Sequence, residues 1–118
     1  MPHVVIEGQA RISDYQQLFR SIDFRQGTRI IKVRKFFLEK GGESALLEVI
    51  AIEVGHQQKY FIQLSEKPEG ITVRLEPLTD PEKNSAVKIS LALVARQIID
   101  MVSGTRYGST SLSEYLIR

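Results

Sequence analysis

Basic and aromatic residues occur at strand-like spacing in the middle of the chain. In a β-strand successive side chains point to opposite faces, so residues two apart share a face. A sheet face with cations and rings can hold single-stranded nucleic acid, because cations attract phosphates and rings stack on bases. The sequence therefore predicts a binding site made of Lys32, Arg34, Phe36, Lys59, Phe61 and Arg74.

Other reactive side chains form no pattern typical of a catalytic or metal site. The chain has no cysteine, and neither His3 nor His56 lies at a ligand-like spacing from a further ligand. No G-x-S-x-G motif is present, and the glycine-containing segment 104–110 lacks the spacing of a phosphate-binding loop. We expect no catalytic residue, metal or cofactor, although carboxylates and tyrosines distant in sequence can still converge in a fold.

Length and composition indicate a single globular domain over residues 1–118. The chain is 42% hydrophobic and 25% charged, which is typical of a protein that folds around one core. Its start lacks the features of a signal peptide, and its longest apolar stretch is broken by Arg96, Gln97 and Asp100. We expect a cytoplasmic protein without membrane association.

Positive charge is concentrated in one segment. The formal net charge is +2, but residues 20–40 hold seven bases and two acids. Such a local excess can steer an anionic partner towards the protein. It is also what an ordinary solvated face looks like, so charge alone does not decide between the two.

The spacing of apolar residues predicts two helices and five strands. Helical spacing behind capping signals favours a short helix over 13–22 and a long one from Thr79 or Asp80 to 103. Runs of β-branched and aromatic residues favour strands at 4–7, 28–39, 44–54, 59–65 and 71–77. Short glycine-containing turns join the last four strands, which favours an antiparallel meander over crossovers.

The resulting order is β-α-β-β-β-β-α, which predicts a two-layer α+β domain with the sheet packed against a long C-terminal helix. The TATA-binding-protein-like and helix-grip folds share this order, a topological analogy that no motif accompanies. Residues 105–110 read as a loop and 111–117 as a helical turn. Segment 105–118 is therefore expected to be flexible or to dock on the domain.

Pairing across the predicted hairpins assigns each strand residue to a face. A Gly41-Gly42 tip pairs Phe37 with Leu46, Lys35 with Glu48, Val33 with Ile50 and Ile31 with Ile52. A three-residue tip at 55–57 then pairs Glu53 with Lys59. The core face carries Ile31, Val33, Phe37, Leu46, Ile50, Ile52, Tyr60, Ile62, Leu64, Ile71, Val73 and Leu75, with the Lys35–Glu48 pair near a sheet end.

The second face carries Lys32, Arg34, Phe36, Leu47, Val49, Ala51, Lys59, Phe61, Gln63, Thr72, Arg74 and Glu76. A face left only to water is more uniformly polar than this, and contiguous exposed apolar groups usually mark a contact surface. We therefore expect a non-enzymatic binding module. The partner is single-stranded nucleic acid, a second copy in a homodimeric assembly protein, or a small apolar ligand held between helix and sheet as in helix-grip folds.

Overall fold

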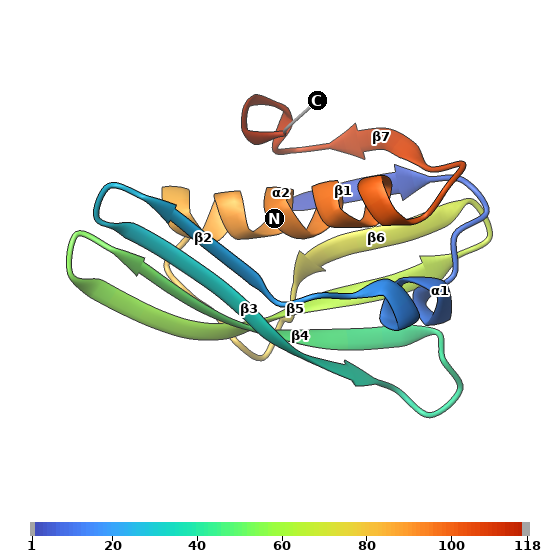
Figure 1. Ribbon diagram of the computed structural model, residues 1–118, viewed down its shortest axis with the longest axis horizontal. Coiled ribbons are helices and arrows are strands. Elements are labelled where there is room, and N and C mark those ends of the chain that lie inside the picture. Colours follow the sequence, from blue (N-terminus) through green and yellow to red (C-terminus); the bar gives the residue numbers. More distant parts are fainter. Residues whose placement is uncertain (1, 117–118) are drawn as a thin grey trace.

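The computed structural model describes residues 2–116, and in it an antiparallel sheet curls around one helix (Figure 1). The elements in chain order are β1 (His3–Glu7), α1 (Ile12–Leu18), β2 (Ile22–Gln26), β3 (Arg29–Leu38), β4 (Ser44–Glu53), β5 (His56–Lys67), β6 (Gly70–Leu75), α2 (Ser85–Met101), β7 (Arg106–Thr110) and the 3-10 helix η1 (Ser113–Tyr115). The strand order in the sheet is β2-β3-β4-β5-β6-β1-β7.

The α+β class and the antiparallel sheet are confirmed, and the order of elements is confirmed in part. Within residues 2–116 the sheet has seven strands rather than the five predicted, because β2 and β7 were not expected. Helix α2 is of moderate length, 17 residues, and β7 follows it. Neither of the two helices in this part of the chain is long and apolar enough to cross a membrane.

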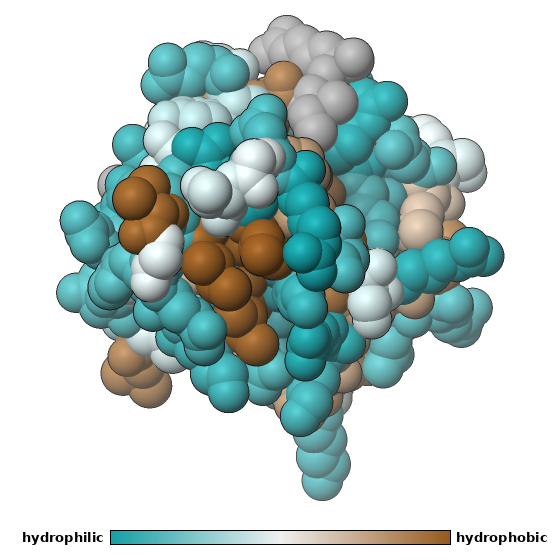
Figure 2. Space-filling model, turned by 60° about the vertical axis from the view of Figure 1, so that its left-hand side comes forward, coloured by the Kyte–Doolittle hydropathy of each residue, from teal (hydrophilic) through white to brown (hydrophobic). Residues whose placement is uncertain are grey.

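Both helices lie on the same face of the sheet, here called the inner face. Helix α2 contacts β1, β3, β4 and β6, and α1 contacts β3, β5 and α2. The buried residues form one core, and their removal from water is the main stabilising term of the fold. Seen with the left-hand end of Figure 1 turned forward, the surface is mostly hydrophilic, with a hydrophobic group near its centre and smaller ones towards the left (Figure 2).

The start of α2 differs from the prediction. Asn84 is the N-cap, and its side-chain oxygen accepts a hydrogen bond from the Val87 amide at 3.0 Å. The Thr79 hydroxyl instead accepts from the Phe61 amide and donates to the Glu76 carbonyl, while Asp80 pairs with Lys83. Thr79 therefore extends the pairing of β5 with the chain beyond β6, and the helix begins only after it.

Helix α1 is fixed by contacts distant in sequence. Its N-cap residue, Arg11, supplies no side-chain hydrogen bond, but the Ile12 amide donates to a Glu66 carboxylate oxygen from β5 at 2.9 Å. The predicted helix reaches residue 22, whereas α1 ends at Leu18 and Ile22 begins β2. Ile22 fits the helical spacing of the preceding apolar residues, but its pairing with Val33 of β3 places it in a strand.

A β-bulge at Arg34 divides β3 into two parts with different pairing. On the side of the β3–β4 turn the prediction is confirmed, since Phe37 pairs with Leu46 and Lys35 with Glu48. The ladder shifts between Val33 and Lys35, so Val33 pairs with Val49 and not with Ile50. Because a bulge adds one residue to a strand, the alternation changes there. Ile31 and Val33 face inward before the bulge, and Phe36 and Leu38 face inward after it.

The β4–β5 turn is shorter than predicted. Val54 and Gly55 form a two-residue turn with φ of 50° and 74°, and Glu53 pairs with His56 rather than Lys59. The observed register differs from the predicted one by an odd number of residues, which reverses the faces of β4 relative to β5. The predicted faces of β4 are therefore wrong: Leu47, Val49 and Ala51 are in the core, and Leu46, Ile50 and Ile52 are outside.

The segment after α2 docks on the domain. Residues 106–110, predicted to be a loop, form β7, which pairs antiparallel with β1. The Thr110 hydroxyl donates to the His3 carbonyl at 2.8 Å. The predicted helical turn over 111–117 corresponds to the shorter η1, and its last residue lies outside the described part of the chain.

Candidate functional site

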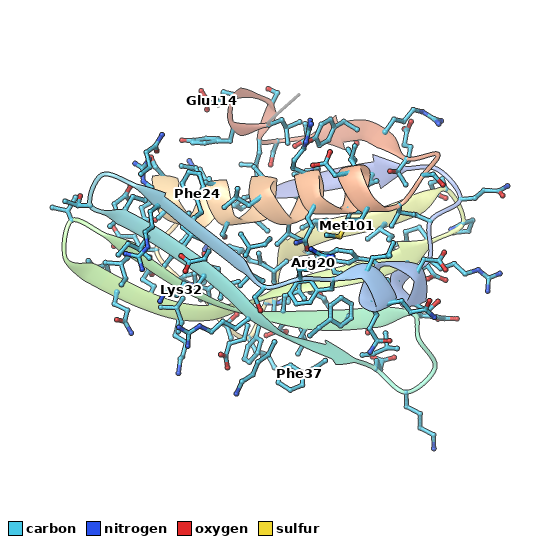
Figure 3. The ribbon with its side chains drawn as sticks, viewed as in Figure 1. Arg20, Phe24, Lys32, Phe37, Met101 and Glu114 are labelled. Atoms are coloured by element: carbon cyan, nitrogen blue, oxygen red, sulfur yellow. The ribbon has the colours of Figure 1, made fainter. Side chains whose placement is uncertain are left out.

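The sheet face opposite the helices, here called the outer face, holds most of the predicted binding residues. In Figure 3, Phe37 points away from α2 on the far side of the sheet, whereas Phe24 from β2 lies beside that helix. Register places five residues of the predicted site on the outer face, namely Lys32, Arg34, Lys59, Phe61 and Arg74. The outer face therefore brings together residues from β3, β5 and β6, with β4 between them.

Phe36 is the predicted site residue that the structure places elsewhere. Its ring lies on the inner face and contacts Tyr15 and Phe19, with centroids 5.6 and 5.4 Å away. The bulge at Arg34 turns Phe36 inward and Phe37 outward, so the prediction of its face is wrong. No residue near Arg34 marks a bulge in the sequence, which is why simple alternation chose the wrong phenylalanine.

Phe37 and Lys35 are outer-face residues that the predicted site omits. The sequence did indicate their position. Lys35 lies opposite Glu48 and Phe37 lies opposite Leu46, so these four side chains share one face of the hairpin. Burying an ion pair in a core carries a desolvation penalty of several kcal/mol. If Lys35 and Glu48 are assigned to the solvent-exposed face for this reason, Phe37 and Leu46 are assigned to the outer face with them.

The apolar part of the outer face centres on two aromatic rings. Phe37 is 50% exposed, and its ring lies edge to face with Phe61 at a centroid distance of 6.4 Å. Leu46, Ile50 and Ile52 from β4 lie between β3 and β5 and are only partly covered. Adjacent apolar groups of this kind on a surface indicate a contact area rather than scattered single residues.

Cations without partners border this apolar area. Within residues 2–116, no hydrogen bond or ion pair engages the side chains of Lys32, Arg34, Lys35 or Lys59. Lys32 and Lys59 both pair with Ile50 across the sheet, one from each side. Arg34 and Lys32 line a hollow of about 370 Å³ beside the start of β2. Positive charge thus lies on both sides of an apolar row.

Acidic residues on the outer face are fewer than basic ones. Asp23 forms an exposed pair with Arg25 at 3.7 Å, and Glu39, Glu48 and Glu76 lie nearer to the rings. The Arg74 guanidinium donates to the Gln63 amide oxygen at 3.1 Å. The bases on this face near the rings and the apolar row are Arg25, Lys32, Arg34, Lys35, Lys59 and Arg74.

The buried polar groups on the inner face hold the helices in place. The Ser90 hydroxyl donates to the Val87 carbonyl at 2.6 Å, so the Tyr60 hydroxyl donates to Ser90 at 2.7 Å. Tyr15 donates to Gln97 of α2, and that amide donates to the Arg20 carbonyl at 2.9 Å. Burial raises the pKa of both Tyr15 and Tyr60 above the usual range. Both hydroxyls thus stay protonated at neutral pH and act as structural donors.

The titratable groups of the described residues do not assemble into a metal site. No three His, Asp or Glu side chains between residues 2 and 116 converge so that they could hold an ion. Each fully buried side-chain nitrogen or oxygen in this part of the chain has a hydrogen-bond partner. Polar groups free to meet a ligand therefore lie on the surface, and the unpartnered cations of the outer face are among them.

The sequence matches no family model, no curated protein and no solved structure. The topological analogy with TATA-binding-protein-like and helix-grip folds gains no support from these comparisons. Function must therefore be inferred from the chemistry of the outer face.

Proposed function

We propose that the protein is a non-enzymatic binding module that holds single-stranded nucleic acid on its outer face. The main support is the position of the unpaired cations Lys32, Arg34, Lys35 and Lys59 beside the exposed ring pair of Phe37 and Phe61. Sheet faces with this combination bind single strands without needing a named sequence motif.

The cations fit a phosphate backbone because they have no intramolecular partner to give up. Neutralising phosphates with lysine and arginine releases counterions, so the affinity falls as the salt concentration rises. Arg34 contributes in a particular way, since the bulge places it next to Lys35 on the outside of the strand. Two neighbouring residues of β3 thus both present charge to the same side.

The rings supply the contact that a simple basic patch lacks. Phe37 is half exposed, and its edge-to-face contact with Phe61 limits how the ring can turn. Stacking of a base on such a ring contributes about 1–3 kcal/mol. Because stacking works with any base, this part of the interaction is tolerant of sequence.

A homodimer formed through the outer face is the alternative, and its electrostatics are less favourable. In a two-fold interface the same patch of each copy meets the other. Each outer face carries more bases than acids, and Lys32 and Lys59 lie near its centre. Bringing two such faces together opposes like charges, which disfavours association.

The apolar-ligand alternative finds no support in the packing of the inner face. Most buried residues of α2 and of the inner face belong to one continuous core. Among them are Ile31, Leu47, Ile62 and Leu91, each fully removed from solvent. Side chains packed to this degree favour a filled space between the helix and the sheet.

Binding of a fluorescent mixed-sequence single-stranded 12-mer, measured by anisotropy at low and high salt, tests the proposal. We expect micromolar or tighter binding that weakens steeply with salt, and a loss of about fivefold or more for Arg34→Ala and for Phe37→Ala. Arg11→Ala removes an exposed cation from the helix side and serves as the matched control.

Binding that does not depend on salt, or no binding at micromolar protein, would reject the proposal. Sedimentation of the same samples distinguishes the alternative. A dimer that forms without nucleic acid and dissociates in Phe61→Asp, together with no oligonucleotide binding, would assign the outer face to self-association.

A further inference from the structure

The outer face is hollowed beside Phe37, at the end of the sheet that carries the β3–β4 turn. This hollow has a volume of about 320 Å³, at the lower end of the roughly 300–1,000 Å³ that is typical of ligand pockets. It is lined by Phe37, Glu39, Ser44, Leu46, Gln63 and Glu76, among others. A planar ring stacked on Phe37 would have its edge close to polar groups of β5 and of the chain after β6.

Gln63 lines this hollow, and the donor side of its amide is free. The guanidinium of Arg74 can only donate, so the Gln63 oxygen must be the atom that faces it at 3.1 Å. The amide nitrogen of Gln63 forms no hydrogen bond with the described residues and keeps both of its N–H groups free. Gln63 is thus oriented by its neighbour as a hydrogen-bond donor.

The carboxylate of Glu76 is an acceptor with one oxygen free. Its Oε2 accepts a hydrogen bond from the Leu78 amide at 2.9 Å, and its own backbone amide donates to the Phe61 carbonyl at 2.9 Å. These two bonds hold Glu76 beside β5, next to the rings. Oε1 has no partner among the described residues, and a carboxylate can accept two parallel N–H groups at once.

Only one of the common bases can accept from the Gln63 donor and also donate two adjacent N–H groups to the Glu76 carboxylate. On its Watson–Crick edge guanine has a carbonyl oxygen followed by two adjacent N–H donors. Adenine and cytosine place a ring-nitrogen lone pair next to a single amino group, and thymine and uracil have one N–H between two carbonyls. A lone pair or a carbonyl oxygen set against the Glu76 carboxylate is repulsive, because both are acceptors.

We infer that this hollow selects guanine within the single strand that the outer face holds, an inference that rests on the proposed function. Guanine stacks on Phe37, its carbonyl oxygen accepts from Gln63, and its two N–H groups donate to Glu76. The cations Lys32, Lys35 and Lys59 lie on the rows of the sheet nearer the β4–β5 turn, where they hold the neighbouring phosphates. Single-stranded nucleic acids are read on base edges in this way.

Anisotropy titrations with three single-stranded 9-mers test the inference: all thymine, the same with one central guanine, and the same with inosine in its place. We expect the guanine oligonucleotide to bind about tenfold tighter than all-thymine, as a good bidentate base contact provides. Inosine lacks the exocyclic amino group, so most of this preference should be lost with it.

Two variants connect the preference to the residue. Glu76→Gln keeps the size of the side chain and an oxygen for the Leu78 amide but removes the bidentate acceptor, so the guanine preference should disappear while all-thymine binding is retained. Glu114→Gln makes the same change on the helix side of the molecule, far from Phe37 (Figure 3), and should keep the preference. Thermal unfolding of both variants verifies that they are folded.

The outcomes separate this inference from the proposed function. Equal binding of all three oligonucleotides, or a guanine preference that persists in Glu76→Gln, overturns guanine selection and leaves single-strand binding in place. No binding of any oligonucleotide overturns both.

Discussion

Phe37 and Phe61 contact each other edge to face on the outer side of the sheet, with ring planes at 68°. Phe36, the residue before Phe37, points to the other side and closes a cluster with Tyr15 and Phe19. The bulge at Arg34 sets this division. Of these two adjacent phenylalanines, Phe36 thus packs in the core and Phe37 belongs to the candidate site.

Substitution of these two residues should separate stability from binding. Phe36→Ala removes a partly buried ring from the α1–β3 cluster and should lower the free energy of unfolding by about 2–3 kcal/mol. Phe37→Ala should change it by about 0.5 kcal/mol or less and weaken oligonucleotide binding. Urea unfolding and anisotropy measure the two effects. The reverse pattern, with Phe37→Ala the more destabilising, would contradict the assigned faces.

The turn between β4 and β5 has a strained backbone at Val54, and a substitution there should increase the stability of the fold. Val54 is 85% exposed and has a φ of 50°, a conformation that β-branched residues disfavour. Two-residue turns with positive φ at both positions prefer Asn-Gly, and Gly55 is already present. Val54→Asn should raise the free energy of unfolding by about 1 kcal/mol. Val54→Ala, which keeps most of the strain, should gain less, and equal gains for both would argue against this cause.

The contact of Glu66 with the start of α1 should be worth about 1–2 kcal/mol of stability. Glu66→Ala leaves the Ile12 amide without its side-chain acceptor, whereas Glu66→Gln retains an oxygen at the same position. Urea unfolding should show a clear loss for the first variant and a small one for the second. Similar losses for both would mean that the charge of Glu66 matters more than its hydrogen bond.

The buried tyrosines should make the fold sensitive to alkaline pH. Burial raises the pKa of Tyr60 above its usual range, and the hydrogen bond with Ser90 offsets only part of this shift. A group with a higher pKa in the folded chain stabilises the fold below its unfolded pKa, about 10 for tyrosine, and this contribution is lost as the pH rises further. The free energy of unfolding should therefore fall between pH 9 and 11.

Tyr60→Phe provides the matched test of this pH dependence. The variant keeps the ring and loses the ionisable hydroxyl, and Ser90 still donates to the Val87 carbonyl. It should be about 1 kcal/mol less stable at pH 8 and should lose less stability than the wild type on going to pH 11. Urea unfolding at pH 8 and pH 11 measures the stability of both proteins. If both lose the same stability between these pH values, groups other than Tyr60 cause the alkaline effect.

Local patterns were sufficient to predict both helices, strand β1, the four strands from β3 to β6 and the class of the fold. Helical and strand periods are properties of neighbouring residues, so segments such as 85–101 and 44–53 show them without any knowledge of the rest. Alternation also assigned four of the predicted cations to the face on which the structure has them. Lys32, Arg34, Lys59 and Arg74 are exposed or partly exposed on the face for which they were proposed.

The faces of β4 and the identity of the exposed rings were decided by tertiary structure. Strand β4 is apolar at nearly every position, so alternation alone gives no preference for Leu47 and Val49 over Leu46 and Ile50 as core residues. The choice depends on a one-residue bulge in β3 and on the length of the β4–β5 turn. Since side chains alternate with a period of two, each such unit change exchanges the two faces, and only the packing of the whole sheet against α2 determines which arrangement buries more apolar surface.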